Sequence, residues 1–331
     1  GASGMSREAV RDAILGASRV TVICHENPDA DTLGSALALR MAAERLGKQA
    51  EVVAADPVPP WLVGLPYADE VHVTPRLEAD LAVVVDGPLS RTGAVVRDCG
   101  AWLKRARVVN IDHHISNDGS EALAAWVDPD AAATCEMLAM LIPELGIEID
   151  EQIATVLTAG IVQDTHTFSH PNATPRTLRV AADLVEAGAP LARIHRSIYA
   201  DKAFSMLALW GKILAGATER RDGRIVHASM TLAMLAETVT EPDASEGFID
   251  LLASTKAADI TMLFKEADAS QTRVSVRTSA NADAVAITSA FGGGGHARAA
   301  GCTVDGPLAD AMTRVLDECE RELARADARG R

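Results

Sequence analysis

The stretch VTVICHENPDAD, residues 20–31, passes directly from an apolar run into a cluster of polar side chains. The run Val20–Cys24 is short and rich in β-branched residues, which is typical of a buried strand in a parallel sheet. His25, Asp29 and Asp31 follow it at once. Because ligand sites of open α/β sheets lie beyond the carboxyl ends of the strands, this stretch predicts both the fold class and the place of a site.

Two more apolar runs end in the same way. Leu81–Val85 precedes Asp86, and Arg107–Ile111 precedes Asp112-His113-His114. The carboxyl ends of parallel strands meet at one edge, so we expect these polar residues to converge with the first cluster. The carboxylates would repel one another unless cations lay among them, and a pair of divalent metal ions meets that need.

Strand and helix signals alternate from residue 6 to about residue 190, which predicts a doubly wound α/β domain with a mainly parallel sheet. Helices are expected at Thr32–Gly47, Ala131–Leu141 and Asp150–Val162, and a strand at Gln49–Ala54. The segment from Ala173 to Ala217 is expected to be mostly helical.

From Gly223 onward the pattern changes to that of a smaller α+β domain. Its strands are expected at 224–230, 259–266 and 272–279, and its helices near 231–237, 246–254 and 308–328. We therefore predict a first domain over residues 5–190, a helical linker over 191–217 and a second domain over 218–331.

The chain has 331 residues, a net charge of −15 and 48% hydrophobic residues. This length allows two domains with cores of their own, and the negative charge argues against tracking along long nucleic acid. No apolar run reaches the roughly 20 residues of a membrane helix. The five cysteines fit no disulfide or zinc pattern, and Gly1-Ala2-Ser3-Gly4 resembles a cloning remnant, so a cytoplasmic protein is expected.

Asp164 stands at the carboxyl end of the helix predicted to begin at Asp150. The helix dipole opposes a carboxylate there, which suggests that a cation holds it. Each acidic position also has an ordinary alternative: Asp31 could cap the helix at Thr32, and Asp86 could be a turn residue. Oxygen and imidazole ligands without a thiolate favour manganese or magnesium over structural zinc.

The ordered set His25-x-x-x-Asp29-x-Asp31, Asp86, Asp112-His113-His114 and Asp164 resembles the four motifs of the DHH phosphoesterase superfamily. The run Gly292-Gly293-Gly294-Gly295-His296, followed by Ala299-Ala300-Gly301, resembles the signature of the DHHA1 domain. With this architecture the chain is similar to the bacterial nanoRNase/oligoribonuclease (NrnA-type) subfamily, and its alanine- and arginine-rich composition fits an actinobacterial member, such as a mycobacterial one.

The resemblance implies roles for the matching positions. His25 and Asp29 would bind one manganese ion, and Asp31, His113 and Asp164 would surround a second, with Asp86 between the two. His114 would face the scissile phosphate, and Asp112 would orient the histidines. Magnesium or cobalt are the alternatives to manganese. The family often has Thr-Gly after the last aspartate, whereas this chain has Thr165-His166-Thr167-Phe168. His166 and Phe168 could therefore stack on a base or fill a wall of the protein.

Several residues are candidates for contacts with substrate. The glycine run offers backbone N–H donors to an anion at close range, the alternative being a flexible linker. Arg277 could form a bidentate contact with a terminal phosphate, as a similarly placed basic residue of the family does. The remaining candidates are Gly293, Gly294, Gly295, His296, Ser90, Arg91 and Arg298.

The resemblance implies hydrolysis of phosphate esters by two-metal activation of water. The expected substrates are di- to tetranucleotides such as pApA, cyclic di-AMP, and 3′-phosphoadenosine 5′-phosphate (PAP), with 5′-mononucleotides as products. A homodimer is expected by the same resemblance, and neither long nucleic acid nor a membrane is an expected partner.

Three other functions fit parts of the pattern. A manganese inorganic pyrophosphatase shares the N-terminal motifs, but the glycine signature argues against it. A RecJ-type single-strand exonuclease would carry a further nucleic-acid-binding domain and less negative charge. A nucleotide-binding regulatory module without catalysis would have little use for a full set of metal ligands.

Overall fold

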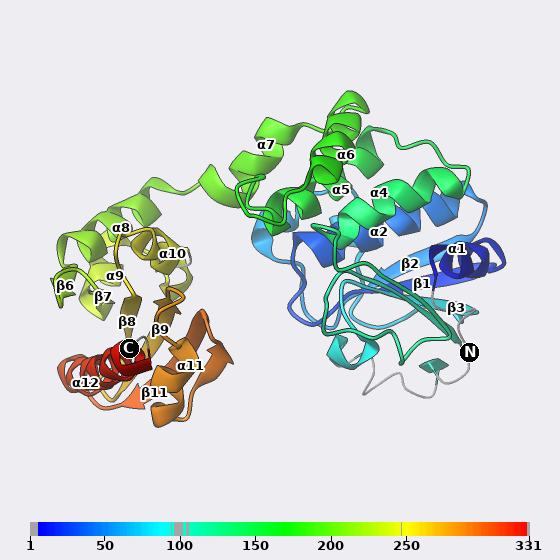
Figure 1. Ribbon diagram of the computed structural model, residues 1–331. Coiled ribbons are helices and arrows are strands. Elements are labelled where there is room, and N and C mark those ends of the chain that lie inside the picture. Colours follow the sequence, from blue (N-terminus) through cyan, green and yellow to red (C-terminus); the bar gives the residue numbers. More distant parts are fainter. Residues whose placement is uncertain (1–5, 94, 96–101, 104–105, 246, 330–331) are drawn as a thin grey trace. The chain divides into compact units, whose positions relative to one another are not determined.

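The computed structural model describes residues 6–329, except 94, 96–101, 104–105 and 246. The chain divides into two compact units, Gly1–Asp201 and Lys202–Arg331, each with its own hydrophobic core (Figure 1). Cys24, Cys135, Cys302 and Cys319 are buried free thiols, while Cys99 and the first residues, Gly1 to Gly4, lie outside the described residues.

The first unit is built on a five-stranded sheet in the order β2-β1-β3-β4-β5, and every neighbouring pair is parallel. The strand order reverses between β1 and β3, because β2 lies on one side of β1 and all later strands lie on the other. Ligands of doubly wound sheets bind at such a reversal, beyond the strand ends. The strands are β1 (Arg19–Ile23), β2 (Gln49–Val53), β3 (Leu81–Val85), β4 (Arg107–Asp112) and β5 (Ala124–Val127).

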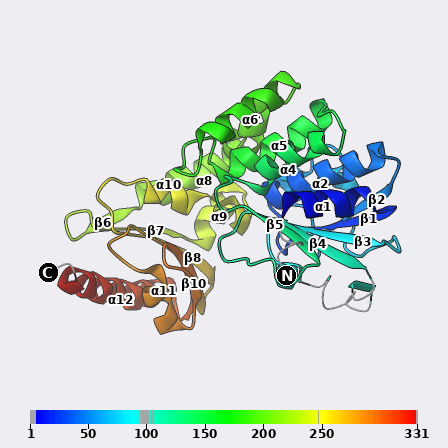
Figure 2. The ribbon, with the colours of Figure 1, turned by 45° about the vertical axis from the view of Figure 1, so that its right-hand side comes forward.

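Both faces of this sheet are buried, as its apolar strands require. Val20 and Val22 of β1 pack into the larger core, whereas Ile23 packs with Val84 and Leu103 on the opposite face. Helices α2 (Ala30–Arg45), α4 (Thr134–Glu144) and α5 (Glu151–Asp164) lie together over the larger core (Figure 2). The other helices given for the described residues of this unit are α1 (Arg7–Leu15), α6 (Pro175–Glu186) and α7 (Leu191–His195), with shorter helical turns at Pro60–Leu62, Ala68–Glu70, Leu89–Arg91 and Arg196–Ala200.

The second unit has a six-stranded mixed sheet in the order β10-β11-β9-β8-β7-β6, in which only β7 and β8 are parallel. Helices α11 and α12 cover one face of the sheet, and α8, α9 and α10 cover the other. The strands are β6 (Thr218–Arg220), β7 (Ile225–Met230), β8 (Ile260–Asp268), β9 (Gln271–Thr278), β10 (Gly294–His296) and β11 (Ala299–Asp305). The helices are α8 (Phe204–Ala215), α9 (Leu232–Thr238), α10 (Phe248–Ala253), α11 (Ala284–Thr288) and α12 (Leu308–Arg329), with shorter turns at Pro242–Ser245 and Ser289–Phe291.

The predicted fold class is confirmed: a doubly wound parallel sheet precedes a smaller α+β region. The start of the first site helix differs from the prediction. Helix α2 begins at Ala30, and Asp29 is its N-cap, since the Asp29 carboxylate accepts the backbone N–H groups of Asp31 and Thr32. The alternative in which Asp31 caps the helix is therefore wrong, because Asp31 lies within the first turn.

Strands β5, β6, β10 and β11 were not predicted from the sequence. Three of them have only three or four residues, and β11 (AAGCTVD) is rich in alanine and glycine. Such segments lack the β-branched runs that mark the other strands, so pairing with neighbours decides their conformation.

Candidate metal centre

Four segments of the first unit meet beyond the carboxyl edge of the sheet. The loop after β1, the residue after β3, the pair after β4 and the end of α5 each contribute polar side chains to one cluster. The sequence-predicted ligands that lie together there are His25, Asp29, Asp31, Asp86, His113 and Asp164.

His113 occupies the centre of one half of the cluster. Its Nε2 atom lies 3.3 Å from Asp164 Oδ2, 3.4 Å from Asp86 Oδ1 and 3.8 Å from Asp31 Oδ2. Asp31 is fully buried, and the side chain of Asp164 is 20% exposed. Three carboxylates therefore face a single imidazole nitrogen.

His25 occupies the centre of the other half. Its Nε2 atom lies 3.4 Å from Asp86 Oδ2 and 3.6 Å from Asp29 Oδ1. The side chain of Asp29 is 35% exposed, so this half is the more open of the two. Asp29 keeps its capping bonds to α2 at the same time, which fixes the carboxylate at the helix N-terminus.

Asp86 links the two halves. Its Oδ1 atom faces His113 and its Oδ2 atom faces His25. The backbone at Asp86 has a φ of 62°, in the left-handed region that few residues other than glycine adopt. A strained backbone at a buried, shared carboxylate is typical of a functional site. Asp86 is therefore a bend residue after β3, as in the sequence alternative, whose carboxylate also faces both histidines.

Backbone carbonyls fix the rings of both histidines. His25 Nδ1 lies 2.7 Å from the Glu26 carbonyl oxygen, and His113 Nδ1 lies 3.2 Å from that of Ala131. A carbonyl only accepts, so each Nδ1 carries the hydrogen, and Nε2 is the atom directed at the carboxylates. Metal-binding histidines are commonly oriented in this way.

His114 differs from His113 in its surroundings. Its Nδ1 atom lies 2.7 Å from Asp112 Oδ1, and its side chain is 40% exposed. The Asp112 carboxylate also accepts the backbone N–H groups of His113 and His114 and the side-chain amide of Asn117. Asp112 thus bonds to the backbone of both His113 and His114. The ring of His114 bonds to Asp112 through Nδ1, which leaves Nε2 on the other side of the ring.

The charges of the cluster act strongly on one another. Burial lowers the pKa of His25, but Asp29 and Asp86 outweigh burial and raise that pKa to about 10. For His113, burial is likewise outweighed by Asp164 and Asp86, which raise its pKa to about 12. Burial and the neighbouring charge of Asp86 raise the pKa of Asp164 to about 6. The carboxylates draw positive charge onto the imidazoles, and the same field attracts a cation.

The donor set fits divalent metal ions. Three overlapping groups have ligand atoms within 4.8 Å of one another, and Asp86 and His113 each belong to two of them. The groups are His25 with Asp29 and Asp86, Asp31 with His113 and Asp164, and Asp86 with His113 and His114. Carboxylate and imidazole donors suit manganese, magnesium or a related ion.

Sequence reasoning missed the residues that hold Asp31. Its two carboxylate oxygens accept the backbone N–H groups of Thr134 (2.7 Å) and Cys135 (2.8 Å), at the start of α4. Gly160 on α5 leaves room for it, since a Cβ there would lie 2.7 Å from Asp31 Oδ1 and 2.4 Å from Cys135 Sγ. A helix start and a helical glycine carry no sequence signal for such a contact.

The segment after Asp164 forms an unusual turn. His166, Thr167 and Phe168 have positive φ values of 47°, 54° and 63° in succession. The His166 ring is exposed and lies against Tyr199, with 4.5 Å between the centroids, whereas Phe168 packs against the core of the first unit. Phe168 thus packs within the first unit, and the His166 ring is exposed beside Tyr199.

Ser90 and Arg91 lie in the helical turn Leu89–Arg91, which follows Asp86 closely. Both are exposed, and the Arg91 carbonyl accepts the backbone N–H of Glu26, next to His25. The backbone of the turn after β3 is therefore hydrogen-bonded to the loop after β1.

The substrate-contact candidates of the second unit gather at one end of its sheet. Arg277 on β9 lies opposite Ala299 on β11, and its Nε atom donates to Asp250 at 2.9 Å. The glycine run is a hairpin strand rather than a linker, because β10 pairs with the start of β11. A Cβ on Gly293 would lie 2.3 Å from the Gly301 oxygen, so this glycine is required by close packing.

The remaining candidates of the second unit lie within this hairpin. Arg298 is exposed, and its guanidinium donates to the Ala282 carbonyl. Gly294 and Gly295 lie in β10 together with His296, whose side chain is outside the part that the structure describes.

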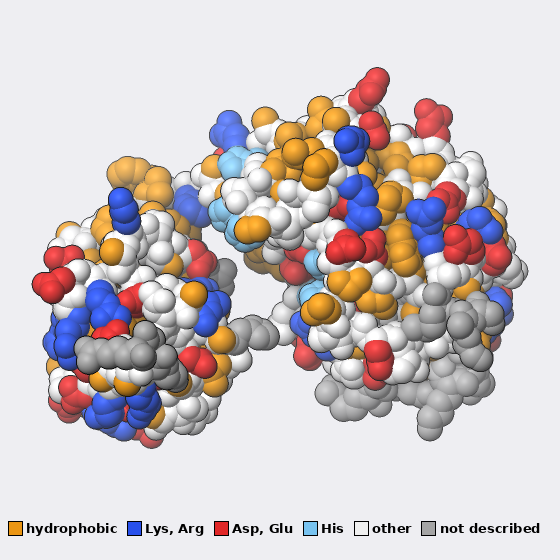
Figure 3. All heavy atoms as spheres, viewed as in Figure 1, with side chains coloured by type: hydrophobic (Ala, Val, Ile, Leu, Met, Phe, Trp, Pro, Cys, Tyr) orange, Lys and Arg blue, Asp and Glu red, His pale blue; other side chains and the backbone are white. Residues whose placement is uncertain are grey.

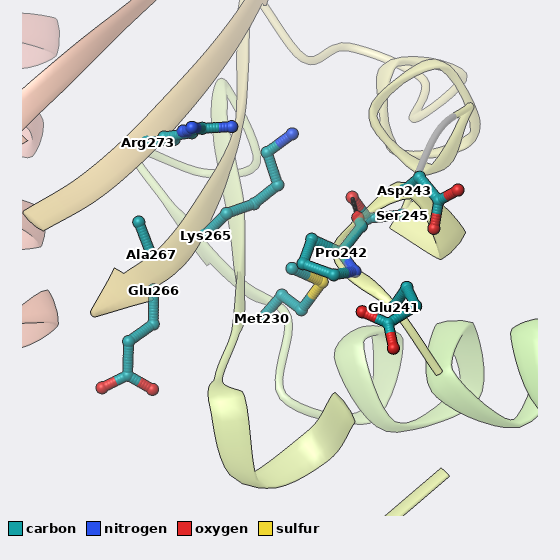
Figure 4. A pocket seen from close by; sticks show the side chains of 9 residues that line it. All are labelled: Met230, Glu241, Pro242, Asp243, Ser245, Lys265, Glu266, Ala267 and Arg273. Carbon is teal, nitrogen blue, oxygen red and sulfur yellow. Dashed lines mark hydrogen bonds between the residues drawn. The ribbon is translucent and has the colours of Figure 1, made fainter. Parts of the chain in front are cut away.

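A separate pocket of about 490 Å³ lies toward the opposite end of the same sheet. Lys265 and Arg273, which lie opposite each other on β8 and β9, extend toward it, and carboxylates line its other side (Figure 4). None of the sequence-predicted site residues lines it. The lining residues are Met230, Glu241, Pro242, Asp243, Ser245, Lys265, Glu266, Ala267 and Arg273.

Basic and acidic side chains are interspersed on the face seen in Figure 3, and the histidines visible there belong to the first unit. Among the described residues, no helix combines the length and the apolar character that crossing a membrane requires.

Two family models match this chain, one within each of the two compact units. Residues 19–161 match the model of the DHH family, N-terminal domain, and residues 223–325 match the model of the DHHA1 domain. The first match contains the segments after β1, β3 and β4, together with most of α5, and the second contains the glycine hairpin and Arg277.

Curated relatives cover nearly the whole chain. A bifunctional oligoribonuclease and PAP phosphatase NrnA from Thermus thermophilus is 34% identical over 93% of this chain and 91% of its own length. The NrnA protein of Bacillus subtilis is 27% identical over 86% of this chain and 89% of its own length. The crystal structure of an exopolyphosphatase-related protein from Bacteroides fragilis shares the fold, with a TM-score of 0.85 at 22% identity and coverage of 97% and 98% of the two chains.

Proposed function

Since this chain belongs to the DHH family of phosphoesterases, carries a DHHA1 domain and is thus a hydrolase of phosphate esters, we propose that it degrades short nucleotides with two divalent ions. The proposed substrates are short oligoribonucleotides, including pApA, and PAP, as in the names of its relatives. Cyclic di-AMP is a further proposed substrate, opened to pApA and then cleaved to AMP.

The observation that carries the proposal is the placement of Asp86. One carboxylate oxygen faces the group of His25 and Asp29, and the other faces the group of His113. A buried carboxylate with this arrangement suits a residue shared by two ions. Asp31 and Asp164 would complete the inner group around His113.

Manganese is the proposed ion, with magnesium or cobalt as alternatives. When bound, the pair of ions would lower the pKa of a bound water and stabilise the charge that develops on the phosphate. Carboxylate and imidazole ligands without a thiolate support this choice over structural zinc.

His114 has a different proposed task. Its hydrogen bond to Asp112 raises its pKa, so that the positively charged ring is favoured. A partly exposed imidazolium can donate from Nε2 to a phosphate oxygen and balance its charge. Asp112 would keep the ring in this orientation and, through the backbone N–H of His113, align the neighbouring ligand.

The second unit is the proposed substrate-binding part. Arg277 would contact the phosphate remote from the cleaved bond, and the glycine hairpin with His296 and Arg298 would contact the rest of the nucleotide. Ser90, Arg91 and His166 would contact substrate from the first unit. We propose 5–190 as the catalytic domain, 191–217 as the linker and 218–331 as the substrate-binding domain, in a homodimer.

The test is turnover with manganese on four substrates side by side: pApA, cyclic di-AMP, PAP and pyrophosphate. The control variant replaces Asp112, His113 and His114 together by alanine. AMP formed from the adenylates by the wild type, and not by the variant, would support the proposal, and the relative rates would rank the substrates. Phosphate released from pyrophosphate alone, or binding of nucleotides without turnover, would replace the proposal by one of the other functions.

A further inference from the structure

The hydroxyl of Thr134, at the first position of α4, donates to Asp86 Oδ1 at 3.1 Å. Both side chains are buried, with exposures of 0% for Thr134 and 2% for Asp86. A hydroxyl has a single hydrogen to donate, so this contact uses the whole donor capacity of Thr134. The bonded oxygen is the one that faces His113, while the other oxygen faces His25.

Two threonines of α5 and its C-terminal end donate differently. Thr155 and Thr165, both in or at the end of α5, donate to the carbonyl four residues before them. Thr134 begins its helix and has no earlier turn of α4 below it, so its hydroxyl is free to reach another element. The N-cap residue, Ala133, offers no side-chain cap, and the first N–H groups of α4 donate instead to the carboxylate of Asp31.

We propose that Thr134 is a positioning residue that fixes the rotation of the Asp86 carboxylate, so that each oxygen stays turned toward one half of the metal centre. The inference rests on the proposed two-metal function and assigns a task to a residue outside the predicted site. Asp86 needs such a contact because its position between the two histidines would allow its oxygens to exchange by rotation about the terminal bond.

The same short segment supports two more of the predicted ligands. The backbone N–H groups of Thr134 and Cys135 hold the carboxylate of Asp31, and the Ala131 carbonyl holds the ring of His113. Residues 131–135 therefore act on Asp31, Asp86 and His113 together. Among these contacts, only the one to Asp86 comes from the Thr134 side chain, so a substitution there tests it alone.

Glu136 holds residues 131–135 in place through bonds on the side away from the ligand cluster. Its fully buried carboxylate accepts the backbone N–H of Ala132 at 3.0 Å and the hydroxyl of Thr177 at 2.8 Å. Arg176 forms an ion pair with the other oxygen. A fixed segment is what a positioning hydroxyl requires, since a mobile donor would follow the carboxylate instead of orienting it.

The decisive substitution is Thr134→Val, which has nearly the same shape and lacks the hydroxyl. Thr134→Ser restores the donor, and Thr155→Val is the matched control, a buried threonine whose hydroxyl bonds within its own helix. The readouts are manganese affinity by titration, the electron paramagnetic resonance spectrum of the manganese-loaded protein, and the thermal melt of the metal-free protein.

The wild type should show the spectrum of a magnetically coupled manganese pair. In Thr134→Val we expect affinity for one ion to fall about 10- to 100-fold, the range for residues that orient metal ligands. The coupled spectrum should give way to that of isolated ions, while Thr134→Ser and Thr155→Val keep it. If Thr134→Val does not fold, Thr134→Ala provides the same test.

Two results with the variants would overturn this inference alone. A Thr134→Val protein with wild-type affinity and an unchanged coupled spectrum would show that Asp86 is held without the hydroxyl. Equal losses in Thr134→Val and Thr155→Val would assign the effect to general packing. A wild type that binds a single ion or none would reject the two-metal function itself, and this inference with it.

Discussion

The two units treat their charged candidate residues in opposite ways. In the first unit, Asp31 and Asp86 are buried, and the ion pairs recorded for them among the described residues are with imidazoles. In the second unit, Arg277 and Arg298 are partly or fully exposed and bond to groups of their own domain. Buried carboxylates without a fixed cation are costly to the fold, whereas a solvated arginine is not. The first unit therefore carries the stronger structural argument for a ligand.

The largest effect is expected from Asp86→Asn, which changes a buried carboxylate of the first unit. Asparagine tolerates the left-handed backbone at this position, removes the charge and replaces one acceptor oxygen by an NH2 donor. We expect turnover to fall by about 1,000-fold or more, because the loss of a shared ligand removes several kcal/mol of transition-state stabilisation. Manganese binding by calorimetry should be lost in parallel.

The control for this variant is Asp80→Asn, a carboxylate of the same unit that accepts the backbone N–H groups of Ser18 and Arg19 away from the cluster. It should keep turnover and manganese binding. Retained manganese-dependent activity in Asp86→Asn would contradict the metal assignment.

Metal removal should change the stability of the two units differently. An ion that binds only the folded first unit stabilises it by about 2.7 kcal/mol at a concentration 100 times its Kd. We expect chelation to lower the unfolding temperature of the first unit and to leave that of the second unchanged, because their cores are separate. Hydrogen exchange with and without manganese would measure this, and equal changes in both units would contradict it.

Two helical glycines, one in each unit, test whether packing beside the ligand cluster matters more than packing in the second unit. Gly160→Ala places a Cβ against Asp31 and Cys135, and overpacking of this kind costs about 1–3 kcal/mol of stability. Manganese affinity should fall as well, because Asp31 must move. Gly211→Ala on α8 meets nothing within 4 Å and should be neutral or stabilise by up to about 1 kcal/mol.

Chemical denaturation and manganese titration of the two glycine variants would check these values. A Gly160→Ala protein with wild-type stability and metal affinity would show that α2 and α5 can separate without displacing Asp31.

The smallest effect is expected at Arg277. Arg277→Ala should raise KM about tenfold, a loss of about 1.4 kcal/mol that is typical of a hydrogen bond to a charged group, and leave manganese affinity unchanged. Arg273→Ala, at the other end of β9, is the matched control and should leave KM unchanged. Steady-state kinetics with pApA would decide, and an unchanged KM in Arg277→Ala would remove this residue from the substrate site.

The sequence predicted the fold class because three β-branched runs each end in acidic or imidazole residues. It also predicted which residues would gather, since parallel strands end at a common edge. It could not predict the contacts of Thr134, Cys135 and Gly160, which depend on how α2, α4 and α5 pack. Helix packing is set by many apolar contacts at once, and no local pattern records it.

The glycine run illustrates a different gap. From its composition it could have been an anion-binding segment or a linker, and its pairing with β11 in the structure is contrary to the linker alone. That pairing involves residues 299–301, whose alanine and glycine content gives little strand signal. The helix cap shows the same kind of gap. Helix α2 starts two residues earlier than predicted, at Ala30 instead of Thr32, so its cap is Asp29 and not Asp31.

The separate cores of the two units have an evolutionary consequence. Every predicted metal ligand comes from the first unit, and the second unit keeps its own apolar interior. Mutations in the second unit can therefore accumulate without disturbing the charge balance of the ligand cluster. With substrate binding in the second unit and hydrolysis in the first, as proposed, a lineage with this architecture would acquire a new nucleotide preference by remodelling one half of the gene while the other half is inherited intact.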